Sequence, residues 1–125
     1  VNTSHEESKY GISPEEAVAL VRQTARYDTL KIYGLMTIGL FTKDEVKIRK
    51  CFKALKEIND NIAKEGIDRV QMKYLSMGMS GDYQIAIEEG ANMVRIGTAI
   101  FGLRLTPDAY YWPSEKTDAD RAKQH

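Results

Sequence analysis

Two turns rich in glycine and hydroxyl residues are the parts of this chain best suited to bind an anion. The first lies in Leu75-Ser76-Met77-Gly78-Met79-Ser80-Gly81-Asp82, and the second lies in Val94-Arg95-Ile96-Gly97-Thr98-Ala99-Ile100-Phe101-Gly102. In each segment an apolar strand is followed by glycine and hydroxyl residues just before a helix can begin. The first turn of a helix has free backbone N–H groups, which bind anions. The two turns together therefore predict a phosphate-binding site.

Four residues of these turns are candidate phosphate ligands. Gly97 has no Cβ, so backbone can approach a phosphate closely there, and the Thr98 hydroxyl can donate a hydrogen bond. Ser80 and Gly81 occupy the equivalent place after the preceding strand. The structural alternative is that Ser80 is only the N-cap of the next helix. One such turn is weak evidence for a site, whereas two neighbouring turns are more specific.

Arg95 lies in the strand that leads into the second turn. Alternation along a strand puts Arg95 on the face opposite Val94 and Ile96. If those two residues pack on helices, Arg95 points into the interior of the fold. An interior arginine must be paired, because burying it alone costs several kcal/mol. Two alternatives follow: a structural ion pair with an acid from a half of the fold that this chain lacks, or contact with a ligand.

Strands and helices are expected to alternate along the whole chain. The apolar runs predict strands at 1–4, 31–38, 72–77 and 93–96, and helices at 13–27, 42–65 and 82–89, with a short extra helix at 98–101. Ser13-Pro14-Glu15-Glu16 and Thr42-Lys43-Asp44-Glu45 both fit the capping-box pattern of a helix start, and Gly66 should end the second helix. Strands separated by helices imply parallel pairing and an α/β fold.

Four parallel strands could form an open sheet or half of an eight-stranded (β/α)8 TIM barrel. The barrel is favoured because barrel enzymes commonly bind phosphate at the loops after the last two strands, together with a short extra helix. Half a barrel would leave two strand edges unpaired and its interior uncovered. We therefore expect residues 1–105 to be the C-terminal half of a barrel that is completed by an N-terminal half of the same or a partner chain. We expect residues 106–125 to be a partly disordered tail.

Composition excludes several classes of function. The 125 residues contain 18 Lys and Arg and 18 Asp and Glu, so the formal net charge is zero and nucleic acid is not an expected partner. No apolar run approaches the roughly 20 residues of a membrane helix, and no secretory pattern begins the chain. The single Cys51 excludes an internal disulfide and fits a cytoplasmic protein. His5 and His125 have no neighbouring ligand pattern, so no metal site is proposed.

The motifs resemble those of a known family. Leu75 to Ser80 and Val94 to Gly102 closely resemble signatures of the YggS/PROSC family, the pyridoxal phosphate homeostasis proteins. Asn2-Thr3-Ser4 with Glu7-Ser8-Lys9-Tyr10-Gly11, and Gly34 to Gly39, are similar to the two preceding signatures of that family, in the same order. The resemblance extends from Val1 to about Arg104 and corresponds to the C-terminal half of a family member.

The resemblance implies a barrel related to the alanine racemase N-terminal domain, with pyridoxal 5′-phosphate at its mouth. By that resemblance Ser80, Gly97 and Thr98 contact the phosphate and Arg95 faces the pyridine nitrogen. Arginine can only donate hydrogen bonds, so the ring nitrogen would stay unprotonated and the cofactor would be a weak electron sink. A weak sink suits carrying the cofactor better than fast carbanion chemistry.

The resemblance also places the Schiff-base lysine in the first barrel strand, within the half that this chain lacks. Lys9 is expected to be a solvated loop lysine, although it could lie near the barrel mouth, and Lys73 is expected at the wrong end of its strand. No catalytic residue is therefore assigned.

Three functions follow from these observations. The first is a protein of intracellular cofactor homeostasis that buffers pyridoxal phosphate or delivers it to apoenzymes, without turnover of its own. The second is an amino acid racemase of the alanine racemase type, for which Tyr110 and Tyr111 are the only loose candidates for a second acid/base. The third is a chain that binds no cofactor alone and only pairs with a complementary half.

Overall fold

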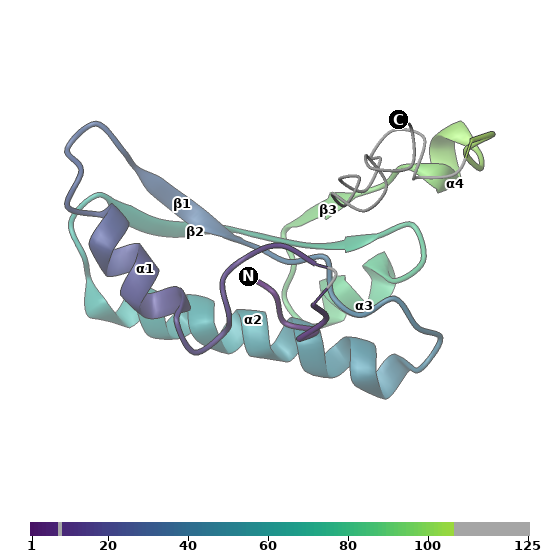
Figure 1. The fold of residues 1–125 in the computed structure, drawn as a ribbon, viewed down its shortest axis with the longest axis horizontal. Helices are drawn as coiled ribbons and strands as arrows, with labels where there is room; N and C mark the ends of the chain where they lie inside the picture. Colours follow the sequence, from purple (N-terminus) through teal and green to yellow (C-terminus); the bar gives the residue numbers. More distant parts are fainter. Residues whose placement is uncertain (8, 107–125) are drawn as a thin grey trace, which may run out of the picture.

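The structure is a layer of parallel strands with three helices on one side and a short fourth helix beyond its last strand (Figure 1). It is a computed structural model that describes residues 1–7 and 9–106. In chain order the elements are α1 (Ala17–Thr24), β1 (Ile32–Met36), α2 (Glu45–Glu65), β2 (Val70–Met79), α3 (Tyr83–Glu88), β3 (Met93–Arg95) and α4 (Thr98–Phe101). The alternating α/β order that the sequence predicts is confirmed for these elements. The tail expected at 106–125 lies outside the described residues, except for Thr106.

The described residues form a three-stranded parallel sheet in the order β1-β2-β3. The expectation of a fourth strand at residues 1–4 is wrong. The Val1 nitrogen donates to the Met36 carbonyl at 2.7 Å, but Thr3 N then turns back to the Val1 carbonyl at 3.2 Å. A strand needs a continuing ladder of such bonds. This segment therefore lies beside the end of β1 without extending the sheet.

The hydrophobic core lies between the sheet and the helices. Phe52 and Leu55 of α2 are fully buried there, together with Met77 of β2 and Ala86 of α3. Leu75 belongs to the same cluster, so Ser76, which lies between Leu75 and Met77 in the chain, points to the opposite face. One face of the sheet is thus packed on helices and the other is available to a second layer.

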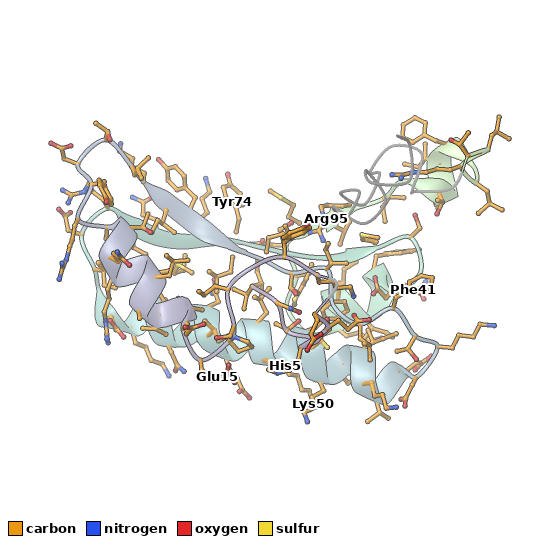
Figure 2. All side chains as sticks on the ribbon, in the orientation of Figure 1. His5, Glu15, Phe41, Lys50, Tyr74 and Arg95 are labelled. Atoms are coloured by element: carbon orange, nitrogen blue, oxygen red, sulfur yellow. The ribbon has the colours of Figure 1, made fainter. Side chains whose placement is uncertain are left out.

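The second face of the sheet carries several apolar side chains and is incompletely covered. Alternation places Met36, Tyr74 and Met93 on it, and their exposed fractions are 48%, 38% and 43%. In Figure 2, Tyr74 lies on the side of the sheet away from α2. The face that a closed barrel would enclose is therefore partly open to solvent in this chain.

The longest helix, α2, begins and ends with strong local signals. The side chain of Asp44 accepts hydrogen bonds from Val46 N at 3.1 Å and Lys47 N at 3.2 Å. Asp44 is therefore the N-cap, and the predicted capping role of Thr42 is wrong, since its hydroxyl accepts from Asp44 N instead. Gly66 ends the helix in the left-handed region at φ 59°, as predicted.

The first helix, α1, is shorter than the sequence predicts. The Ser13 hydroxyl donates to the Glu16 carboxylate at 2.7 Å instead of capping the backbone, so the predicted capping box does not form. Residues 13–16 make a turn, and α1 begins at Ala17. It ends at Thr24, with further turn bonds as far as Tyr27.

Candidate functional site

Ser80 joins the two turns on which the predicted phosphate site depends. Its hydroxyl oxygen accepts hydrogen bonds from Gly97 N at 3.2 Å and from Ala99 N at 3.1 Å. The structural alternative, in which Ser80 caps the next helix, is wrong, because the N-cap of α3 is Asp82. The Ser80 hydroxyl instead lies at the N-terminus of α4, where it accepts from the first backbone N–H groups. Since its oxygen accepts both bonds, its own proton remains available to a ligand.

The glycines of these turns fall into two groups with different roles. A Cβ added at Gly81 or Gly97 would meet no described atom within 4 Å. Packing within the described residues therefore does not require glycine at either position, and both leave room for a ligand to approach the backbone. A Cβ at Gly78 would lie 2.6 Å from the Ala86 Cβ, and Gly78 has φ 94°. Gly78 is required by the contact between β2 and α3.

Asp82 closes the first turn. Its carboxylate accepts from Met79 N at 2.7 Å, and its backbone N–H donates to the Met79 carbonyl at 3.1 Å. These two bonds hold Ser80 and Gly81 in a tight loop at the end of β2. The carboxylate therefore shapes the turn.

Arg95 lies on the open face of the sheet and is held by two neutral oxygens. Its Nη1 donates to Ser76 Oγ at 2.7 Å, and its Nη2 donates to the Thr37 carbonyl at 2.8 Å. The contact with Ser76 confirms that Arg95 points away from the helices, as it does in Figure 2. Burial lowers the pKa of the guanidinium from its ordinary value, and the negative charge of Asp82 opposes this shift.

The charge of Arg95 is not neutralised by a direct partner in the described part of the chain. The ion pairs between described residues involve other side chains. A half-buried guanidinium with neutral acceptors keeps its positive charge and further N–H donors. The described residues supply no acid in contact with the guanidinium, and the structural alternative places its acid outside this chain, so both alternatives for Arg95 stay predictions.

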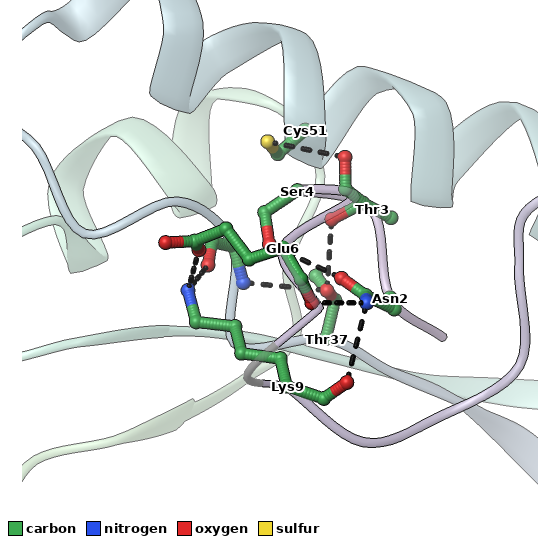
Figure 3. Close-up of polar contacts among 8 residues, drawn as sticks. Asn2, Thr3, Ser4, Glu6, Lys9, Thr37 and Cys51 are labelled. Carbon is green, nitrogen blue, oxygen red and sulfur yellow. Dashed lines mark hydrogen bonds and ion pairs between the residues drawn. The ribbon is translucent and has the colours of Figure 1, made fainter.

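Lys9 is more enclosed than a solvated loop lysine, which corrects the sequence-based expectation. Its ammonium group donates to the Gly39 carbonyl and pairs with Glu6 Oε2 at 2.5 Å, and its side chain is only 20% exposed (Figure 3). A cavity of about 350 Å³ beside it is also lined by Ser4, Thr37 and Gly39. Lys9 therefore lies near the end of β1, which agrees with the alternative that places it near the barrel mouth. Lys73 lies inside β2, where its ammonium is 5.1 Å from the centre of the Tyr74 ring.

A buried polar network behind Arg95 was not predicted. Thr37 is 2% exposed, and its hydroxyl lies 2.8 Å from the Thr3 hydroxyl and accepts from Gly39 N at 3.3 Å (Figure 3). The thiol of Cys51 donates to the Thr3 carbonyl at 3.4 Å. The available signal is a polar residue in or directly after an apolar strand: Thr37 follows β1, and Ser76 lies in β2.

Membrane-spanning helices and metal-binding clusters are absent from the residues that the structure describes. No helix within the described residues is both long and apolar enough to cross a membrane. The same residues contain no group of three or more His, Cys, Asp or Glu side chains that could hold a metal ion.

Comparison with known proteins defines the class to which this chain belongs. Residues 1–105 match the alanine racemase N-terminal domain, and the chain belongs to this family. Within it, the chain is 42% identical over 104 residues to a pyridoxal phosphate homeostasis protein of Aquifex aeolicus, covering 83% of this chain and 45% of the relative. It is also 42% identical over 106 residues to the human protein of the same name, covering 83% and 38%.

Solved structures of similar proteins support the same family. The crystal structure of an unknown protein from Bifidobacterium adolescentis is 44% identical in sequence, with a TM-score of 0.75 over 81% of this chain and 40% of that one. PipY of Synechococcus elongatus, solved with PLP bound, is 25% identical, with a TM-score of 0.69 over 82% and 47%. The resemblance to pyridoxal phosphate homeostasis proteins is thereby confirmed. The chain spans less than half the length of these relatives, and its three strands match part of their barrel domain.

Proposed function

We propose that this chain forms the part of a pyridoxal phosphate homeostasis protein that binds the phosphate and the ring nitrogen of the cofactor. The whole protein would buffer pyridoxal phosphate or deliver it to apoenzymes in the cytoplasm. The observation that carries the proposal is the pair of hydrogen bonds from Gly97 N and Ala99 N to the Ser80 hydroxyl. They join two turns that end neighbouring strands, at the edge where α/β folds bind ligands.

The residues of the joined turns fit a phosphate. Ser80 and Thr98 offer hydroxyl groups, and no described atom fills the space beside Gly81 and Gly97, although the Gly97 N–H is itself donated to Ser80. We propose that these four residues hold the phosphate of the cofactor. Hydroxyl and backbone donors at the end of parallel strands suit a phosphate because they bind its oxygens without a large net charge.

Arg95 fits the ring nitrogen of the same ligand. It comes from the strand that immediately precedes Gly97, and its charge meets only neutral oxygens among the described residues. When bound, pyridoxal phosphate supplies an aldehyde that reacts with amino groups and a ring that withdraws electrons. An arginine that can only donate keeps the ring nitrogen unprotonated and weakens that withdrawal. This supports carriage of the cofactor over turnover.

The remaining part of the barrel would supply what this chain lacks. We propose that this chain corresponds to the C-terminal half and that an N-terminal half, in the same or a partner chain, carries the lysine that binds the aldehyde. The exposed apolar face that includes Met36, Tyr74 and Met93 supports a second layer over the sheet.

The experiment is to express the full product of the gene and incubate it with pyridoxal phosphate. The protein should become yellow, and borohydride should fix the cofactor to a lysine outside this chain, as identified by peptide mass spectrometry. Arg95→Ala should bind the cofactor at least tenfold more weakly, whereas Ser13→Ala, which removes a hydroxyl from the exposed turn before α1, should bind it as the parent does. A parent protein that stays colourless and takes up no cofactor would overturn the proposal.

An amino acid racemase is the second candidate, because the matching family is named for alanine racemase. Racemization needs a second acid/base group, and the loose candidates Tyr110 and Tyr111 lie outside the described residues. Loss of optical rotation from L-alanine with the cofactor-loaded full-length protein would favour the racemase, and constant rotation would favour the carrier.

A further inference from the structure

We infer that Ser76 and Thr37 are positioning residues that fix the direction in which Arg95 donates to the cofactor ring. The inference rests on the proposed function, since it concerns the ring nitrogen of bound pyridoxal phosphate. Its physical basis is a connection across all three described strands: Thr37 follows β1, Ser76 lies in β2 and Arg95 ends β3.

The two acceptors hold different nitrogens of the guanidinium. Ser76 Oγ accepts from Nη1 and the Thr37 carbonyl accepts from Nη2, at 2.7 and 2.8 Å. A guanidinium is a planar fork, so holding both of its terminal nitrogens sets the orientation of the plane. The N–H groups that these bonds do not use must then point in fixed directions.

The acceptors are themselves immobile. Thr37 N donates to the Ser76 carbonyl at 3.1 Å, so the two residues are joined through their backbones. The Thr37 hydroxyl contacts the Thr3 hydroxyl and Gly39 N, and Thr37 and Ser76 are 2% and 8% exposed. A movement of either acceptor would have to break several of these hydrogen bonds together, so the two acceptors hold the Arg95 guanidinium in a fixed place.

The neutrality of both acceptors argues for positioning in addition to stability. A carboxylate partner would hold the arginine equally well, but it would also neutralise the charge that faces the ligand. A hydroxyl and a carbonyl orient the guanidinium and leave its charge in place. Ordering the long arginine side chain before the ligand arrives also removes part of the entropy cost of binding.

The test uses the full gene product loaded with pyridoxal phosphate that carries nitrogen-15 in its ring. The dissociation constant is measured by absorbance titration, and the chemical shift of the ring nitrogen is followed against pH. Ser76→Ala should weaken binding about tenfold and move the pH titration of the ring nitrogen toward that of Arg95→Ala. Thr37→Val should move both quantities in the same direction, and Thr37→Ser, which keeps the hydroxyl, should restore them.

Ser13→Ala is the matched control, since it removes a serine hydroxyl that contacts only Glu16 in the described structure. A Ser76→Ala protein with a lower melting temperature but an unchanged ring-nitrogen titration would overturn the inference, because Ser76 would then be structural only. If Ser76→Ala does not fold, an unchanged titration in Thr37→Val would overturn it. Failure of the parent to bind the cofactor would instead count against the proposed function, so the two failures are distinct.

Discussion

The hydroxyl oxygen of Ser80 lies 3.2 Å from the backbone nitrogen of Gly97 and accepts its hydrogen bond. This contact connects the turn after β2 with the start of α4, although the two residues are 17 positions apart. A single side chain therefore holds together the two parts of the proposed phosphate site.

Replacement of that serine tests the phosphate contact directly. Ser80→Ala should weaken pyridoxal phosphate binding about tenfold, because one hydroxyl donor and the link to α4 are both lost. Pyridoxal without its phosphate is the control ligand, and its affinity should change little. Equal losses for the two ligands, measured by absorbance titration of the full-length protein, would contradict a role at the phosphate.

Gly97→Ala separates ligand approach from stability. An added Cβ would meet no described atom within 4 Å, but the backbone at φ −117° and ψ −80° lies outside the main regions for alanine, so the free energy of unfolding should fall by about 1 kcal/mol. The methyl group should nevertheless obstruct a phosphate at the backbone and weaken cofactor binding about tenfold or more. Urea denaturation measures the stability of the variant, and cofactor titration of the same sample measures its affinity. If the variant binds the cofactor as tightly as the parent does, the phosphate does not approach the backbone closely at Gly97.

Gly78→Ala should reduce the stability of the fold more than Gly97→Ala does. Its φ is 94°, and the new Cβ would lie 2.6 Å from the Ala86 Cβ and 3.0 Å from the Tyr83 Cα. Backbone strain and overpacking together should cost roughly 2–4 kcal/mol of unfolding free energy. Urea denaturation measures this cost. A loss below about 1 kcal/mol would mean that α3 can move away from β2 easily.

The ion pair between α1 and α2 should make stability depend on pH in the acid range. Arg22 donates to both carboxylate oxygens of Glu65, at 2.8 and 2.7 Å, and these bonds lower the pKa of Glu65 below its ordinary value of 4.5. Because the folded pKa is the lower one, the contribution is complete above pH 4.5 and is lost as the pH falls through the folded value.

The matched variant is Arg22→Gln, which keeps a long polar side chain without the charge. Its urea midpoint should fall less steeply than that of the parent as the pH decreases below 4.5, and the two proteins should differ little in high salt. Parallel midpoint curves across this range would show that the exposed pair contributes nothing to stability.

The elements that were predicted well are those that local sequence determines. The apolar positions of α2 recur at helical spacing, and Gly66 ends the helix because it adopts a left-handed backbone easily. The strand runs that became β1, β2 and β3 were likewise visible as short apolar segments between turn residues. Their order alone indicated a parallel α/β arrangement.

Local patterns failed where two partners competed for the same group. Ser13 and Glu16 have the residue types of a capping box, yet the hydroxyl donates to the carboxylate and the helix begins later. Residues 1–4 resemble the end of a strand. In the structure, however, Thr3 N donates to the Val1 carbonyl, and the Thr3 hydroxyl is hydrogen-bonded to the Thr37 hydroxyl. Composition cannot tell which of the available partners a polar group takes.

The amino-acid sequence by itself determined the order of the elements from α1 to α4, the two turns and the face of β3 from which Arg95 projects, because these depend on the spacing of neighbouring residues. Only the tertiary structure decided that Ser80 meets Gly97 N, and that Arg95 meets the carbonyl of Thr37, 58 positions earlier in the chain. Such contacts depend on how strands are registered and where turns end. Packing of distant segments sets both, so no local pattern of residue types encodes them.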